Sequence, residues 1–298
     1  MPEKRYPAVM LATCPVPWTE RYELDENLFR AEVRRLRTEL TPFLYVFGTA
    51  GEGYAVSDAQ FARIARVFRA EMPPDTHAMV GIISLSLSTI IERVALARDL
   101  GFREFQLSLP SWGALTDGEV DVFFRETCGR FPDCLFLHYN LVRSKRLLTG
   151  DDYARLVVAH PNLVAVKMGG EDAAALADIL TKAPFLQCFF TEFGYALMRD
   201  QHECGLLVAV SSVNFKKAQA YFTARGAELA AMRDQLREVH RALKTAIVDE
   251  TYMDGAYDKL YIKLHERCFP LRLAPPYAST SDATFVKFRD ALPAAWRI

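Results

Sequence analysis

The sequence has no long hydrophobic run and no apolar leader, and these two absences exclude several classes of protein. No apolar stretch approaches the length of a membrane span. The first residues, Met-Pro-Glu-Lys-Arg-Tyr, lack the continuous apolar core that a signal peptide requires. We therefore expect a cytoplasmic protein with no membrane partner.

Closely spaced cysteines are also missing. The six cysteines form no Cys-x-x-Cys pair, and their scatter indicates reduced thiols rather than a disulfide framework or a zinc site. No cluster of carboxylates and histidines favours a divalent metal. We expect no metal site. The cysteines are Cys14, Cys128, Cys134, Cys188, Cys204 and Cys268.

An excess of charge of one sign is absent as well. The 36 Lys and Arg residues nearly balance the 37 Asp and Glu residues, which leaves a net charge of −1. The longest basic clusters, such as Arg34-Arg35 and Lys216-Lys217, are short. Without a basic field to drive counterion release, we expect no nucleic-acid partner.

What the sequence does contain is a regular alternation of short apolar runs and amphipathic segments. Ser57 and Gln60 form a capping box for one helix, and Gly101 is a natural stop for another. Eight strands each followed by a helix predict a (β/α)₈ barrel. A doubly wound sheet is the alternative, but no Gly-x-Gly-x-x-Gly turn follows the first strand. The expected strands are 8–12, 43–47, 78–83, 104–109, 134–140, 162–167, 185–190 and 206–210.

The last part of the chain has a different pattern. Apolar residues recur at helical spacing from about residue 227, and Pro270 and Pro275-Pro276 divide the region into segments. We interpret residues 1–226 as the barrel and 227–298 as a C-terminal helical extension packed on it. The spaced apolar residues are Leu229, Met232, Leu236, Val239 and Leu243.

Two polar residues stand where buried strands end. Tyr139 ends one apolar run and Lys167 ends the next. The carboxyl ends of parallel strands are where active sites of such folds lie. A charged ammonium in a dry interior is costly, so a buried lysine tends to lose its proton and become a nucleophile. With a phenol beside it, the pair suits imine chemistry on a keto acid. A strand-end lysine that merely reaches solvent is the alternative.

A glycine-rich segment follows the strand at 43–47. It reads Phe47-Gly-Thr-Ala-Gly-Glu-Gly53. Small residues let a substrate approach the backbone, and free amides can bind a carboxylate. A tight turn that uses glycine only for its geometry is an equal alternative.

These motifs together resemble the dihydrodipicolinate synthase / N-acetylneuraminate lyase family. Tyr139-Asn140 is followed 28 positions later (167 − 139) by the lysine of Val166-Lys167. The glycine-rich segment resembles the family's Gly-Thr-Thr-Gly-Glu loop. Leu271-Arg-Leu-Ala-Pro-Pro276 resembles its proline-bearing C-terminal segment. The resemblance covers essentially the whole chain.

The resemblance implies a class I aldolase-type lyase and a role for each site residue. Lys167 forms the imine with pyruvate or a related 2-keto acid, so no cofactor is needed, and Tyr139 moves protons with Thr49 behind it. Ala50 replaces the second threonine of the loop, so one hydroxyl donor to the carboxylate is missing, although the amides near Gly51 remain. An aldehyde or its adduct is the second ligand, and a homotetramer or homodimer is implied.

The resemblance also implies one more contact with the substrate, and it shows two positions at which this chain differs from dihydrodipicolinate synthase. A backbone carbonyl near Ala209, in the eighth strand segment, would face the substrate. Trp112 stands where dihydrodipicolinate synthase has a relay tyrosine. Ser144 stands where it has a carboxylate-binding arginine, and Arg143 comes one position earlier. We therefore do not expect the dihydrodipicolinate reaction. Trp112 suits a bulky or aryl substrate of a hydratase-aldolase or dehydratase, or else packs at a subunit contact.

The remaining polar groups have structural interpretations. Strand alternation points His138 away from Tyr139, so we expect a hydrogen-bonded structural histidine. Glu52 can simply accept backbone hydrogen bonds, and Glu171-Asp172 resembles an acidic helix start. A non-catalytic barrel that binds a keto acid is the alternative of another class. The second substrate and the direction of the reaction do not follow from the sequence.

Overall fold

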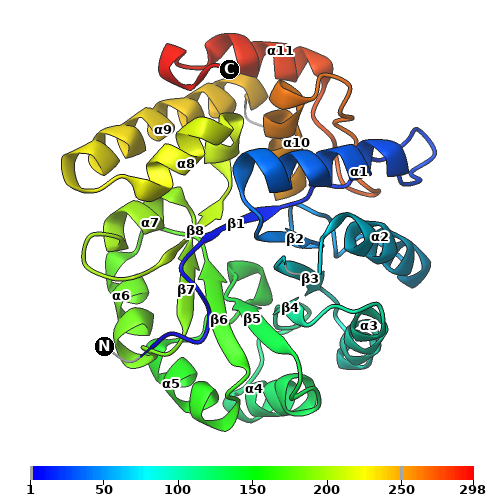
Figure 1. The fold of residues 1–298 in the computed structure, drawn as a ribbon, viewed down its shortest axis with the longest axis vertical. Helices are drawn as coiled ribbons and strands as arrows, with labels where there is room; N and C mark the ends of the chain where they lie inside the picture. Colours follow the sequence, from blue (N-terminus) through cyan, green and yellow to red (C-terminus); the bar gives the residue numbers. More distant parts are fainter. Residues whose placement is uncertain (1–2, 75, 249–250) are drawn as a thin grey trace. The chain divides into compact units, whose positions relative to one another are not determined.

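The computed structural model describes residues 3–74, 76–248 and 251–298. Strands and helices alternate along the chain (Figure 1). The strands are β1 (Met10–Thr13), β2 (Leu44–Val46), β3 (Ala78–Ile82), β4 (Glu104–Leu107), β5 (Leu135–Tyr139), β6 (Leu163–Met168), β7 (Gln187–Phe190) and β8 (Gly205–Val208). The helices are α1 (Glu26–Arg35), α2 (Asp58–Glu71), α3 (Leu87–Asp99), α4 (Asp117–Phe124), α5 (Gly150–Ala159), α6 (Ala173–Lys182), α7 (Glu192–Met198), α8 (Phe215–Thr223), α9 (Gly226–Ile247), α10 (Asp254–His265) and α11 (Asp282–Ala291).

The eight strands form a closed barrel in the order of the chain. The pairs from β3 through β8 are parallel, and so is the pair of β1 with β2. Strands of a parallel barrel are covered on both faces, which explains why β6 and β7 are buried along their whole length. The (β/α)₈ barrel predicted from the alternating pattern is confirmed.

The helix starts follow from capping chemistry. Ser57 and Gln60 make the predicted capping box of α2, since the Ser57 side chain accepts from the Gln60 amide and Gln60 accepts from the Ser57 amide. Thr116 and Thr149 cap α4 and α5 in the same way. Gly101 follows α3 with φ of +93°, a conformation that glycine adopts without steric cost.

Some elements differ from the expected ones. Helix α1 is α-helical only to Arg35, and the chain continues as a π-helical turn over Leu36–Leu40 where a regular helix would be expected. The helix expected after the eighth strand had no predicted bounds, and it is α8 (Phe215–Thr223). Its start is fixed by Asn214, whose side chain accepts from the Lys217 amide.

The described chain divides into two compact units. The first takes in residues of 1–11 and 75–207, where α3 to α6 lie outside β3 to β7 (Figure 1). The second takes in 12–74 and 208–298, and includes β2, α1, α2 and α8 to α11. The expected division at residue 226 stays a prediction, although α9 begins at Gly226.

All five apolar residues expected on one face of α9 are buried: Leu229, Met232, Leu236, Val239 and Leu243.

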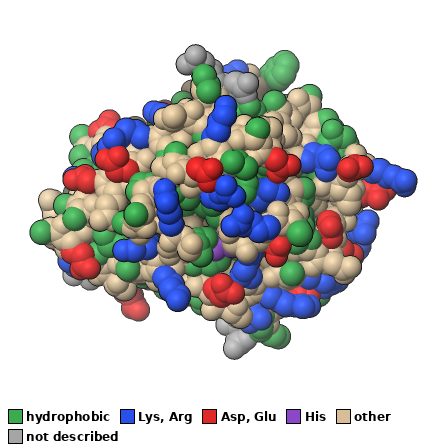
Figure 2. Space-filling model, turned by 90° about the horizontal axis from the view of Figure 1, so that it is seen from above, with side chains coloured by type: hydrophobic (Ala, Val, Ile, Leu, Met, Phe, Trp, Pro, Cys, Tyr) green, Lys and Arg blue, Asp and Glu red, His purple; other side chains and the backbone are tan. Residues whose placement is uncertain are grey.

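The surface fits the balanced composition. Figure 2 shows basic and acidic side chains interspersed with hydrophobic ones on the face displayed, in keeping with a net charge of −1. Across residues 3–74, 76–248 and 251–298, no helix combines the length and apolarity that a bilayer crossing needs.

Candidate active site

Tyr139 and Lys167 lie side by side at the carboxyl ends of two paired strands. They are register partners of β5 and β6, so both side chains project from the same face of the sheet. The Lys167 Nζ atom is 4.0 Å from the centre of the Tyr139 ring. The predicted juxtaposition of an amine and a phenol at a strand-end rim is therefore present in the structure.

Burial separates two interpretations of Lys167. The residue is 1% exposed, and every residue of β6 is buried. This contradicts the alternative of a strand-end lysine that reaches solvent. An amine held in such surroundings is shielded from bulk water, which is the environment that an imine-forming lysine requires.

Asn140 positions the chain around this pair, a role that the sequence did not indicate. Its backbone amide donates to the Lys167 carbonyl over 2.9 Å. Its side-chain amide donates to the Leu148 carbonyl (2.8 Å) and its side-chain oxygen accepts from the Leu148 amide (2.9 Å). The buried Asn140 thus closes the loop 141–148 and ties the end of β5 to the backbone of Lys167.

The glycine-rich loop after β2 packs closely on its own backbone. A Cβ at Gly51 would lie 2.7 Å from the Phe47 nitrogen, and one at Gly53 would overlap the Phe47 carbonyl. Phe47 itself has φ of +65° and Glu52 has φ of +56°. The glycines are therefore needed for the turn, whatever else the loop does.

The same loop also presents unused hydrogen-bond donors. Within the described part of the chain, the amides of Thr49, Ala50 and Gly51 donate to no protein acceptor. These residues are nevertheless buried, with Thr49 6% and Ala50 7% exposed. Buried amides are normally paired, so three successive unpaired ones point to an anion. A carboxylate is an anion that such a loop can hold.

Glu52 fixes the loop by a buried network. Its Oε1 atom accepts from Lys259 Nζ (2.5 Å) and from Trp18 Nε1 (3.0 Å), and its Oε2 atom accepts from the Ala274 amide (2.5 Å). The expectation that Glu52 accepts backbone hydrogen bonds is confirmed for Ala274. The contacts with Lys259 and Trp18 were not foreseen.

The segment after β4 presents Trp112 to solvent. Trp112 is 84% exposed, and its carbonyl accepts a hydrogen bond from Lys145 Nζ over 2.9 Å. Lys145 has φ of +59° and follows a short 3₁₀ turn over Val142–Ser144. The indole therefore stands on the surface of its unit rather than in its core.

Ser144 and Arg143 have opposite environments. Ser144 is buried, and its hydroxyl hydrogen-bonds to the carbonyls of Leu141 and Arg146, each over 2.7 Å. Its single hydroxyl proton is thus used within the loop. Arg143 is exposed. The one-residue offset between them does turn the two side chains to different surroundings.

Ala209 follows β8 in an irregular conformation. Its φ is −134° and its ψ is −98°, and its carbonyl accepts from both the amide (3.0 Å) and the hydroxyl (2.6 Å) of Ser212. The carbonyl is polarised by these two donors. Its expected contact with a substrate stays a prediction.

His138 is a structural residue, as expected. It is buried, and its Nδ1 atom is 2.7 Å from the hydroxyl of Tyr153 on α5. Burial lowers the pKa of His138 to about 3, which keeps the ring neutral. A neutral, buried imidazole on the helix side of β5 therefore joins the strand to α5.

The acidic pair after β6 is a helix start. Asp172 is the N-cap of α6, and its side chain accepts from the amides of Ala174 and Ala175. In the part of the chain that the structure describes, no group of three or more His, Cys, Asp or Glu side chains could hold a metal ion.

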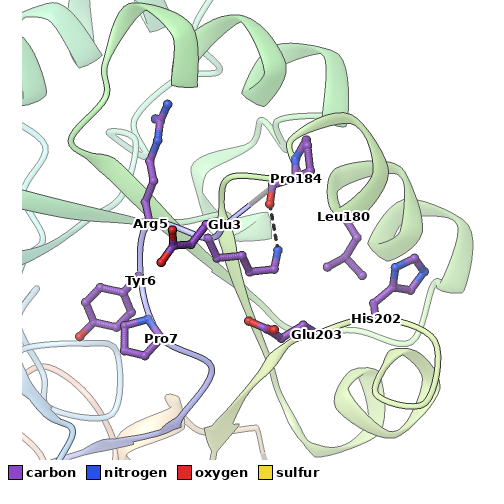
Figure 3. Close-up of a pocket in the computed structure, with 9 residues that line it drawn as sticks. Glu3, Arg5, Tyr6, Pro7, Leu180, Pro184, His202 and Glu203 are labelled. Carbon is purple, nitrogen blue, oxygen red and sulfur yellow. Dashed lines mark hydrogen bonds between the residues drawn. The ribbon is translucent and has the colours of Figure 1, made fainter. Parts of the chain in front are cut away.

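A separate hollow of about 510 Å³ lies beside the N-terminal segment (Figure 3). Lys4 donates there to the carbonyls of Pro184 (3.3 Å) and Leu186 (2.7 Å), and Leu186 directly precedes β7. His202 and Glu203 line it just before β8. The hollow is therefore at the amino ends of the strands, opposite to Lys167, and active sites of barrels lie at the carboxyl ends.

No protein-family model matches the sequence, and no curated protein does. Solved structures match over nearly the whole chain. YagE from E. coli K12, a prophage protein belonging to the dihydrodipicolinic acid synthase family and solved in complex with pyruvate, superimposes with a TM-score of 0.83 at 15% identity. The match covers 97% of this chain and 98% of YagE.

Two further structures give the same result. The N-acetylneuraminate lyase of Proteus mirabilis has a TM-score of 0.82 at 15% identity, with 96% and 98% of the two chains covered. The dihydrodipicolinate synthase of Cyanidioschyzon merolae, solved with lysine bound, has 0.81 at 17%, with 97% and 98% covered. These structural neighbours are members of the family that the motifs resemble. At such identities the likeness shows the fold.

Proposed function

We propose that this chain is a Schiff-base-forming lyase of the dihydrodipicolinate synthase / N-acetylneuraminate lyase family, acting on pyruvate or a related 2-keto acid. The observation that carries the proposal is the pair at the strand ends. A buried amine, Lys167 Nζ, lies 4.0 Å from the ring centre of Tyr139. A lysine and a phenol so placed have the chemistry of a nucleophile and a proton carrier.

The reaction begins with attack of the neutral Lys167 amine on the ketone carbon. The resulting carbinolamine loses water once its hydroxyl is protonated, and an imine remains. Tyr139 supplies and recovers protons in these steps. By the resemblance, Thr49 relays protons to Tyr139. The protonated imine then withdraws electrons from the adjacent carbon. Bond cleavage, condensation or dehydration at that carbon all proceed through this species.

The loop 48–53 would hold the carboxylate of the keto acid. The support is the set of buried amides of Thr49, Ala50 and Gly51 that donate to no protein acceptor in the described chain. Ala50 lacks the hydroxyl that the resemblance would place there. A hydrogen bond to a charged group contributes about 1.5–3 kcal/mol, so carboxylate binding rests on the backbone donors.

The second substrate is an aldehyde other than the one used to make dihydrodipicolinate. Trp112 cannot exchange protons as a phenol does, and the Ser144 hydroxyl is engaged with backbone carbonyls. A hydratase-aldolase or dehydratase with a bulky or aryl substrate is the second candidate, favoured by the exposed indole of Trp112. Both candidates share the imine step.

Exchange of the methyl protons of pyruvate in deuterium oxide tests the proposal without knowledge of the second substrate. An imine that loses a proton to form an enamine, and regains a deuteron, must exchange those protons. We expect enzyme-dependent loss of the methyl proton signal by nuclear magnetic resonance, with heat-denatured protein as the control. A non-catalytic keto-acid-binding barrel would bind pyruvate and leave the signal unchanged, and that result would refute the proposal.

A further inference from the structure

The buried ion pair between Glu52 and Lys259 joins the glycine-rich loop to the C-terminal helices. Both side chains are fully buried, and the Lys259 Nζ atom lies 2.5 Å from Glu52 Oε1. Lys259 belongs to α10, 207 positions further along the chain. Lys259 also donates to the Arg272 carbonyl. One buried ammonium therefore bridges the loop and the segment that follows α10.

Glu52 collects donors from three distant segments. Besides Lys259, these are Trp18 after β1 (3.0 Å) and the backbone amide of Ala274 (2.5 Å). An isolated buried carboxylate would be costly, whereas one with three donors is fixed in place. Glu52 needs this support because it holds φ of +56°, a conformation that side-chain-bearing residues rarely adopt.

Helix α10 also touches the loop directly. Gly255, in its first turn, has no Cβ, and one built there would lie 3.0 Å from the Ala50 carbonyl oxygen and 3.4 Å from Glu52 Cγ. The helix backbone is therefore packed against the residue whose amide is one of the three unpaired donors. Any shift of α10 would be transmitted to the Ala50 peptide through this contact.

We propose that Lys259 is a positioning residue for substrate, which holds the amides of residues 49–51 in the geometry that binds the keto-acid carboxylate. It acts through Glu52, and Gly255 lets α10 approach closely enough for the contact. The C-terminal helical region then takes part in substrate binding, although it contributes no group that touches the substrate. This inference rests on the function proposed above.

Borohydride trapping of pyruvate, measured by mass over a range of pyruvate concentrations, tests the inference. The main variant is the double substitution Glu52→Gln/Lys259→Met, which removes both buried charges together. Removing one partner alone leaves an unpaired buried charge and can prevent folding, whereas replacing both is often tolerated. We expect the half-saturating pyruvate concentration to rise at least tenfold, with the same maximal adduct at saturating pyruvate.

Lys263→Met is the matched control. Lys263 lies one turn further along α10, and its Nζ atom donates to the Phe269 carbonyl (3.0 Å) rather than to the loop. This variant loses the same kind of side chain from the same helix. We expect its half-saturating concentration to stay within twofold of the wild type.

Gly255→Ala gives an independent reading that does not depend on folding of the double variant. Alanine favours the helix more than glycine does, whereas its Cβ would lie 3.0 Å from the Ala50 carbonyl oxygen and press on it. We expect a raised half-saturating concentration in a variant whose cooperative thermal transition shows that it is folded.

The outcomes separate the two proposals. If the wild type forms no adduct at any pyruvate concentration, the proposed function fails, and this inference fails with it. If the wild type forms the adduct, and the folded double variant and Gly255→Ala both saturate at the wild-type concentration, Lys259 serves the fold alone and only the present inference is overturned.

Discussion

In the proposed function, Lys167 is the nucleophile and Tyr139 the proton carrier, and the barrel places the two side chains together. Burial removes Lys167 from solvent, and register pairing sets Tyr139 next to it. Neither residue is unusual alone, since buried lysines occur in ion pairs and strand-end tyrosines are common. The 4.0 Å separation of the Lys167 Nζ atom from the Tyr139 ring centre is what supports the proposal that the two residues act together.

Tyr139→Phe tests whether the phenolic hydroxyl moves protons while Lys167 forms the imine. The substitution removes only the phenolic hydroxyl, so the ring still packs beside Lys167 and the imine can form slowly. General acid–base groups typically contribute about 10²–10⁴-fold to a rate. We expect methyl-proton exchange of pyruvate to fall by that factor while borohydride still traps the imine.

The control for this variant is a cooperative thermal unfolding transition, which shows that the protein remains folded after the hydroxyl is removed. An exchange rate equal to that of the wild type would remove Tyr139 from the mechanism and leave it a packing residue.

At the scale of single elements, β5 carries different functions on its two faces. Tyr139 faces the same side as Lys167, whereas His138 is joined to Tyr153 of α5. Period-two alternation explains the difference. One strand therefore contributes to the candidate site and to the packing of its helix through adjacent residues.

His138 makes stability depend on pH in a defined window. Burial lowers its pKa to about 3 in the folded chain, whereas an unfolded histidine titrates near its ordinary value of about 6.5. Between these values the unfolded state binds the proton and the folded state does not. The free energy of unfolding should therefore fall with decreasing pH, by about 1.4 kcal/mol per pH unit from this group.

The measurement is urea denaturation of the wild type and His138→Asn from pH 8 to pH 4. Below pH 6.5 we expect the free energy of unfolding to fall less steeply with decreasing pH in the variant than in the wild type. The difference between the two slopes should be about 1.4 kcal/mol per pH unit. Above pH 7 neither state of His138 binds a proton, so the two proteins should show equal slopes there. Equal slopes throughout would contradict a buried neutral imidazole.

The elements themselves were largely predictable, because they are encoded locally. Capping pairs such as Ser57 and Gln60 lie three residues apart, and apolar spacing marks the strands and α9. The π-helical ends of α1 and α4 were not predictable, since the same residues suit a regular helix. The bounds of α8 were not predictable because its start depends on one capping residue, Asn214.

The candidate site was predictable only where the strands end. Lys167 and Tyr139 were found because a polar residue interrupts an apolar run at the same rim of the barrel. The contact of Lys259 with Glu52, which fixes loop 48–53, could not be predicted from the sequence. The two residues are 207 positions apart, and nothing in the sequence around Lys259 distinguishes it from a surface lysine. Asn140 was noted in a motif, but its pairing with Leu148 appears only once the loop is folded.

At the scale of the whole molecule, the fold is that of a family with several reactions, so the substrate depends on a few positions. At two such positions this chain differs from the residues that the resemblance implies for dihydrodipicolinate synthesis. Trp112 is 84% exposed where a relay tyrosine is expected, and the Ser144 hydroxyl is held by two carbonyls. The barrel and the proposed imine chemistry at Lys167 are compatible with a different aldehyde.

We therefore expect no more than residual condensation of pyruvate with aspartate semialdehyde. An arginine–carboxylate contact is charge-assisted and often bidentate, and serine matches neither its strength nor its geometry. The loss of a proton carrier costs about a further hundredfold or more. The measurement is a direct assay of the condensation product. Robust condensation would contradict this expectation and would implicate the exposed Arg143 as the replacement contact.

Trp112→Ala is the accompanying test of aldehyde choice, measured as pyruvate consumption with a panel of aliphatic and aryl aldehydes. If the indole contacts the second substrate, the preference among aldehydes should broaden or move while methyl-proton exchange of pyruvate is unchanged. A variant with the same preference and an altered oligomeric state would assign Trp112 to a subunit contact instead.

The most direct test of the central claim is to locate the pyruvate adduct. Wild-type protein and Lys167→Ala are treated with pyruvate and borohydride, digested, and mapped by mass spectrometry. We expect one reduced pyruvyl group on Lys167 in the wild type and none in the variant, with both proteins folded. An adduct on another lysine, or one that persists in Lys167→Ala, would contradict the account.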